Sequence, residues 1–234
     1  MNPTARPRLF ALLWLLAGLC VVPLSAALLF AAAEVIRWAI EHSSGAPNYD
    51  YWDNNFALLL SLYGVISGCC VGILQQVIVA RTWRRKLSGW WRASTLGGLL
   101  GGMAVWLLME PFDYFHRLWS LNLTPSQYSA LHFALPALVL VGCLAAAQAS
   151  WLRRHASGAG LWLAAHALAL LLPLAFAFAQ TGPAALSSSV TGTVWLLSHF
   201  CFLTIFSGIV MYRAMTRSLR HDKAKRINPA PAGA

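Results

Sequence analysis

Long apolar runs separated by short polar connections dominate this chain. A membrane-spanning helix needs about 20 mainly apolar residues, and six runs meet that requirement. They lie near residues 9–40, 56–80, 90–109, 128–151, 159–180 and 188–212. The pattern predicts an all-α integral membrane protein with six transmembrane helices, in which residues 1–234 form a single transmembrane domain and 214–234 a basic tail.

The first apolar run is longer than a single bilayer crossing requires. A cleavable signal peptide has an apolar stretch of only about 7–15 residues, so we interpret the run near 9–40 as a retained span. It also contains Pro23, which removes one backbone hydrogen bond from a helix. We therefore expect this helix to tilt or kink, with one end emerging into water.

The composition agrees with a membrane protein. Hydrophobic residues make up 59% of the chain and charged residues 10%, against about 45–50% and about 25% in soluble domains. The net charge of +10 does not indicate a nucleic-acid binder, because the basic residues gather at helix ends rather than on one soluble face. The five cysteines lie inside apolar runs without CxxC spacing, so we expect no disulfide framework or zinc site.

The distribution of charge predicts an orientation. Positive residues mark cytoplasmic loops, and one set of connections holds Arg6, Arg8, the segment 81–86, Arg153 and Arg154 together with the basic tail. Six of the seven acidic residues belong to the opposite side. We expect both termini to be cytoplasmic, and the basic face to attract anionic lipid headgroups of the bilayer.

Two parts of the chain look alike and predict an internal repeat. The segments "GCCVGILQQVIVARTWRRKLSGWWRASTLGG" and "VGCLAAAQASWLRRHASGAGLWLAAHALAL" each contain a helix end with Gln, a basic turn and a Trp-containing helix start. Their alignment pairs Gln75 with Gln148 and Trp91 with Trp162. The resulting hairpin repeats, near 60–105 and 133–178, would insert in parallel, unlike the inverted repeats of many secondary transporters.

The pattern GxxxGxxQ, a short basic turn and a Trp-containing helix start resembles a group of uncharacterised bacterial multi-pass membrane proteins. The resemblance covers roughly residues 60–180. It implies a multi-pass protein of the bacterial inner membrane built from repeated helical hairpins, and it implies no activity. The second copy departs from the pattern, with Ala145 where Gly72 stands and Ala149 where Gln76 stands.

Glycines recur at helical spacing on the second and third spans. They are Gly64, Gly68 and Gly72 on one and Gly97, Gly98, Gly101 and Gly102 on the other. Small residues let helix backbones approach closely in a membrane. We expect these two spans to pack against each other. The alternative is that one stripe joins two copies of the chain, or a partner in a larger membrane complex.

A small set of polar residues lies inside the apolar spans and forms the candidate ligand site. The set comprises Gln75, Gln76, Gln148, His166 and His199. Polar side chains at membrane depth face protein or water, so these residues either bond neighbouring helices or line a polar cavity. A haem b held by His166 and His199 is a further hypothesis, disfavoured because their depths differ by about 9 Å at about 1.5 Å per residue.

An aromatic connection after the third span holds the outer-face candidates Glu110, Asp113 and His116. It is typical of an interfacial segment, and the alternative is an outward cation or headgroup site; no spacing matches a metal motif. Nucleotide-binding, metalloprotease and serine-hydrolase motifs are absent from the sequence. We therefore expect a non-enzymatic binding or transport component for a small molecule, ion or lipid, with a structural subunit and a haem b electron carrier as alternatives.

Overall fold

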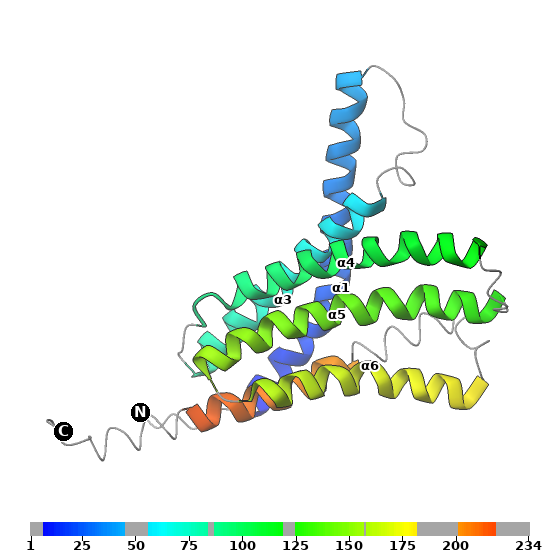
Figure 1. Ribbon diagram of the computed structural model, residues 1–234. Coiled ribbons are helices and arrows are strands. Elements are labelled where there is room, and N and C mark those ends of the chain that lie inside the picture. The colour runs from blue at the N-terminus through cyan, green and yellow to red at the C-terminus, as the bar shows by residue number, and fades with distance from the viewer. Residues whose placement is uncertain are drawn as a thin grey trace, which may run out of the picture.

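The computed structural model describes residues 7–44, 56–83, 87–118, 125–156, 158–181 and 201–218. The regular elements are α1 (Pro7–Ser44), α3 (Phe56–Trp83), α4 (Trp90–Leu118), α5 (Pro125–His155) and α6 (Ala159–Thr181). Residues 201–218 are also helical and are called the C-terminal helix below (orange in Figure 1). Within these ranges the prediction of an all-α protein is confirmed.

Three helical segments are long and apolar enough to cross a membrane. Within the described part of the chain they are Pro7–His42, Ser61–Trp83 and Leu135–His155, and Ala159–Leu172 is a shorter apolar helix. Membrane insertion therefore follows from length and composition.

Two element ends differ from the expected spans. The third span was expected to end near residue 109, whereas α4 continues to Leu118 and includes the backbone of the three outer-face candidates. Of the sixth expected span, only the second half is described, and that helix runs to residue 218, into the predicted basic tail. A helix can continue through polar residues, because its backbone hydrogen bonds still form outside the apolar segment. The length of an apolar run therefore indicates how much of a helix can lie in the bilayer, and the helix itself can be longer.

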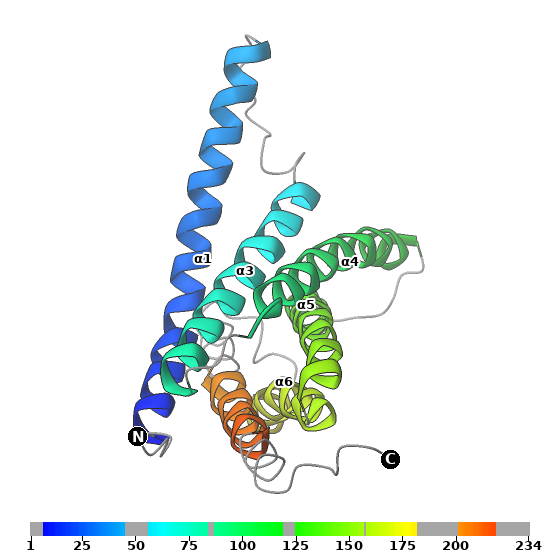
Figure 2. The same cartoon turned by 90° about the vertical axis from the view of Figure 1, so that its left-hand side faces the viewer.

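The helix α1 passes the bundle and projects beyond it (Figures 1 and 2). Its 38 residues correspond to about 57 Å at about 1.5 Å per residue, against about 30 Å for the hydrocarbon core of a bilayer. The helix is continuous through Pro23. Length alone therefore requires that one end of α1 leaves the hydrocarbon, as expected from the sequence.

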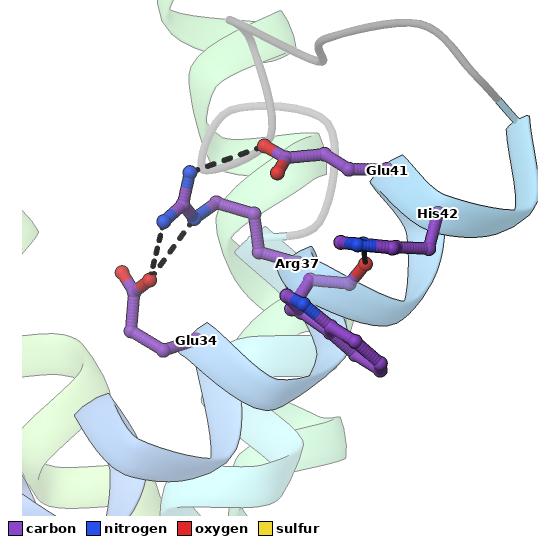
Figure 3. A network of polar contacts seen from close by, with 5 residues as sticks. Glu34, Arg37, Glu41 and His42 are labelled. Carbon is purple, nitrogen blue, oxygen red and sulfur yellow. Dashed lines mark hydrogen bonds and ion pairs between the residues drawn. The ribbon is translucent and has the colours of Figure 1, made fainter.

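A small ion-pair cluster occupies the projecting end of α1 (Figure 3). Arg37 donates to Glu34 at 2.6 Å and to Glu41 at 3.1 Å. The ring of His42 stacks near that of Trp38, with centroids 4.2 Å apart. These contacts join residues of one helix and are largely exposed, so they stabilise α1 only locally.

Consecutive helices are neighbours in space. Among the labelled elements, α3 packs against α1 and α4, and α5 packs against α4 and α6. The C-terminal helix returns to α1, where the indole nitrogen of Trp14 donates to the hydroxyl of Ser207 at 3.2 Å. It also approaches the start of α6, where a Cβ placed on Gly158 would lie 3.8 Å from that of Ala214. These contacts place the described helices around a common interior.

The closest approach in the bundle is between α3 and α4. A Cβ added to Gly64 would collide with the carbonyl oxygen of Gly98, and one added to Gly68 with that of Ser94. At Gly72 the added atom would lie 2.6 Å from the Cα of Trp91. The glycine stripe of α3 therefore lies in its interface with α4, where backbone meets backbone.

The helix α4 carries a second small face toward α5. A Cβ on Gly97 would lie 2.8 Å from the Cβ of Ala147, and one on Gly101 would lie 3.0 Å from the Cα of Leu140. Gly102 belongs to the first face, because its amide nitrogen is 3.3 Å from the Cβ position of Gly64. Glycines on two sides of one helix let α4 fit tightly between α3 and α5.

The basic end of the bundle is closed by large side chains. The main core cluster is Phe10, Trp14, Ile78, Val79, Trp83, Leu87, Trp90, Ala149, Leu152, Trp162, Met211 and Met215. Phe10 and Trp83 meet edge to face at 4.6 Å between centroids. The buried phenylalanine and tryptophan side chains of the described residues all belong to this cluster, so they are concentrated at the basic end of the bundle.

Candidate functional site

A hydrogen-bonded network crosses the bundle and includes Trp90 and Trp162 of this core cluster. Gln75 on α3 accepts two hydrogen bonds at its Oε1 atom, from the indole nitrogen of Trp90 at 3.0 Å and from the amide of Gln148 at 3.4 Å. Both lone pairs of that carbonyl are thereby used. The side chain of Gln75 is held with its carbonyl toward α4 and α5.

Gln148 on α5 is the centre of the network and is only 1% exposed. Its Nε2 atom donates to the hydroxyl of Ser94 at 2.8 Å as well as to Gln75, and its Oε1 atom accepts from the indole nitrogen of Trp162 at 3.2 Å. Both amide hydrogens and the carbonyl have partners. A buried amide that is satisfied in this way links α3, α4, α5 and α6.

The residue one turn after each tryptophan continues the network. The hydroxyl of Ser94 donates to the carbonyl of Trp90 at 3.1 Å, and Nδ1 of His166 lies 2.8 Å from the carbonyl of Trp162. Because a carbonyl only accepts, Nδ1 carries a proton in this contact. The two indole rings meet edge to face, with centroids 5.5 Å apart.

A cavity of about 100 Å³ adjoins the network, between α1, α3, α5, α6 and the C-terminal helix. Its polar lining consists of Tyr63, Ser67, Gln75, Gln148, His166, Thr204 and Ser207. No side chain of Asp, Glu, Lys or Arg is among the described residues that line it. The cavity is therefore largely apolar, with uncharged polar side chains on part of its wall.

The lining offers both donors and acceptors. The carbonyl of Gln75 already has two partners, and its amide group can act as a donor. His166 is 4% exposed and lines the same cavity, and the hydroxyl groups of Tyr63 and Ser67 can both donate and accept. An uncharged molecule that both accepts and donates hydrogen bonds fits this chemistry better than a bare ion.

The volume limits what can enter. One water needs about 10–15 Å³ by this kind of measure, and a cavity of about 150 Å³ holds one benzene ring. A cavity of about 100 Å³ therefore accommodates several waters or one very small solute. A haem macrocycle does not fit beside His166, which argues against the haem b hypothesis at this position.

Three of the five ligand candidates lie together, since Gln75, Gln148 and His166 all line the cavity. Gln76 is not part of its lining, and the buried Oε1 atom of Gln76 has no hydrogen-bond partner in the described structure. His199 lies outside the described residues, as do the side chains of Glu110, Asp113 and His116. In the described chain no three His, Cys, Asp or Glu residues form a group able to hold a metal ion.

Sequence reasoning missed the tryptophans and the serine of the network. The side chain of Trp90 is fully buried, while its neighbour Trp91 is 37% exposed. The alignment paired Trp91 with Trp162, but Trp90 makes the bond to glutamine. Residues four apart lie on the same face of a helix, so Trp90 and Ser94 share the face of Gly98. The spacing of the glycines could therefore have identified Trp90 as the buried tryptophan.

Comparisons of this chain with protein-family models, with curated proteins and with solved structures find no match. The functional interpretation therefore depends on the geometry of the network and the cavity.

Proposed function

We propose that this chain is a non-enzymatic binding or transport component for a small, uncharged, polar solute. The observation that supports the proposal is the group of uncharged polar side chains in the lining of a cavity of about 100 Å³ inside an otherwise apolar helical bundle. Interior polar groups in membrane helices are costly and commonly mark solute or water pathways. The lack of a charged group in the described lining favours a neutral solute over an ion.

We also propose the topology expected from the sequence: six spans in a bacterial inner membrane, both termini cytoplasmic, and two parallel hairpin repeats. The exposed arginines Arg81, Arg92, Arg153, Arg154 and Arg213 support it, because they follow or precede helix ends that meet at the basic end of the bundle. Reporter fusions after residue 218 and within 119–124 test it. An externally active reporter at the C-terminal position would contradict the topology.

Solute flux through proteoliposomes tests the proposed activity. Purified protein is reconstituted, and swelling in urea, glycerol or water gradients is followed by stopped-flow light scattering. Ser67→Leu fills the cavity, since Ser67 lines it and bonds only its own helix at the Gly64 carbonyl, 3.2 Å away. We expect a flux above that of empty vesicles, which Ser67→Leu abolishes.

The matched control is Thr95→Leu on α4. Thr95 likewise bonds its own helix, at the Trp91 carbonyl 2.8 Å away, but does not line the cavity. Its flux should equal that of the unmodified protein. Equal flux in Ser67→Leu and Thr95→Leu, or no flux above empty vesicles for any probe, would contradict the proposal.

The structure lends less support to a subunit that holds partner helices by its glycine faces. Gly68 and Gly72 lie against α4, and Gly97 and Gly101 lie against α5. These surfaces are used within the chain, so they are closed to a partner helix unless α3 and α4 separate.

A further inference from the structure

A second hollow lies outside the bundle interior, between the first turns of α1 and the C-terminal helix. It has a volume of about 290 Å³, and its lining includes Ala11, Leu15, Ile205, Ile209 and Arg213. The two helices run antiparallel here, with the rings of Phe10 and Tyr212 5.8 Å apart at one end and Trp14 bonded to Ser207 further along. Because these helices touch along one line, the hollow is a groove on the outer surface of the bundle.

The groove has the length of one membrane leaflet. It extends over residues 7–15 of α1 and 204–213 of the C-terminal helix, which are about 12 Å and about 14 Å at about 1.5 Å per residue. Half of a hydrocarbon core of about 30 Å is about 15 Å. A single acyl chain that enters from one side of the bilayer would therefore lie along the whole groove.

Charge lies at one end of the groove only. Its lining is mainly apolar, and the polar groups are Thr204 at one end, the indole nitrogen of Trp14, which is bonded to Ser207, and Tyr212 and Arg213 at the opposite end. Arg8 and Arg217 are exposed near the same end, four residues or less from groove residues on their own helices. The ion pairs recorded for the described residues are those of Arg37 at the other end of α1, so the positive charge at the groove has no carboxylate partner among them.

We propose that this groove binds one anionic phospholipid from the leaflet at the basic end of the bundle. The acyl chain lies between α1 and the C-terminal helix, and the phosphate lies at the arginine end. Arginine matches phosphate geometry with two parallel hydrogen bonds, and basic pockets between membrane helices are typical headgroup sites. The apolar length of the groove favours a lipid over free phosphate. Trp14 and Thr204 line both this groove and the solute cavity, but the lipid proposal does not depend on the proposed solute.

Native mass spectrometry of the full chain, released from nanodiscs of phosphatidylglycerol and phosphatidylcholine mixed in equal amounts, tests this site. We expect one phosphatidylglycerol to remain bound after mild activation. Ala11→Trp fills the groove and should remove this retained lipid. Arg213→Gln removes one charge and should weaken retention about fivefold, the effect of about 1 kcal/mol per arginine near a membrane surface.

Matched controls separate the groove from general effects. Leu12→Trp adds the same ring at the next position of α1, where the side chain is 55% exposed and outside the groove. Arg153→Gln removes an exposed charge on α5. Both should retain the lipid. Equal retention of the two lipids, retention unchanged in Ala11→Trp, or equal losses in Arg153→Gln and Arg213→Gln would overturn the proposal. Because Arg213 is exposed, its variant still tests the groove if Ala11→Trp does not fold.

Discussion

The α3–α4 hairpin and the α5–α6 hairpin make the same side-chain bond but pack differently. In each, a tryptophan donates its indole hydrogen to a glutamine 15 or 14 residues earlier in the chain, Trp90 to Gln75 and Trp162 to Gln148. In each, the side chain four residues after the tryptophan bonds the tryptophan carbonyl. The polar contacts are therefore nearly equivalent.

The backbones differ because only one hairpin has a glycine stripe. Gly64 and Gly98 bring α3 and α4 into backbone contact, whereas a Cβ added to Gly142 of α5 or Gly160 of α6 meets nothing within 4 Å. The residue one turn after the first tryptophan is the small Ser94, buried in the contact; its counterpart His166 faces the cavity. The polar network links both hairpins, and the glycines bring only α3 and α4 into backbone contact.

Enlarging a glycine should produce the largest difference between the hairpins. Gly98→Leu places side-chain atoms where the Gly64 carbonyl lies and should destabilise the fold by about 3 kcal/mol or more. The matched change Gly142→Leu enters open space on an exposed position and should change stability by less than about 0.5 kcal/mol. Thermal unfolding in detergent, followed by size-exclusion fluorescence, measures both. Similar losses would mean that the stripe does not distinguish the hairpins.

Removing the central amide should have the next largest effect. Gln148→Leu leaves the indole hydrogen of Trp162 without its acceptor and the hydroxyl of Ser94 without its donor, at a cost of about 1–3 kcal/mol. Gln76→Leu removes a buried carbonyl that has no partner in the described structure, so stability should be unchanged or increase. The same unfolding assay compares them, and a greater loss for Gln76→Leu would refute the assigned network.

The equivalence of the two tryptophans can be measured by double-mutant cycles. Trp90→Phe with Gln75→Leu and Trp162→Phe with Gln148→Leu should each show a coupling energy of about 0.6 kcal/mol, the typical interhelical value in membranes. Trp91→Phe, which changes the exposed neighbour, should show none with Gln75→Leu. Coupling to Trp91 in place of Trp90 would restore the register that the sequence alignment predicted.

The ion pairs at the projecting end of α1 should matter least. Arg37→Gln breaks contacts within one exposed helix, where such pairs contribute little, and should leave the unfolding temperature of the bundle unchanged. A clear decrease would mean that this end of α1 contributes to the bundle, and that the two hairpins are not its main stabilising units.

The helical class and the α3–α4 packing face could be read from the sequence, because apolar length and four-residue glycine spacing are local properties. The glutamines were also recognisable as polar groups at membrane depth. The choice between Trp90 and Trp91 was not, since adjacent residues differ by about 100° around a helix and only tertiary packing sets that rotation. The cavity was equally hidden, because Ser67, Thr204 and Trp14 come from three helices whose proximity no short pattern encodes.

Water contact inside bilayer-embedded protein tests most directly the cavity that lies beside the hydrogen-bonded network of the two hairpins. Solid-state NMR with magnetisation transfer from mobile water reports which labelled nitrogens touch water. We predict rapid transfer to the side-chain amide of Gln75 and the ring of His166, which line the cavity, and slow transfer to the fully buried indoles of Trp90 and Trp162. Equally slow transfer to all four groups would show a dry, filled interior and would contradict a water-accessible cavity beside the network.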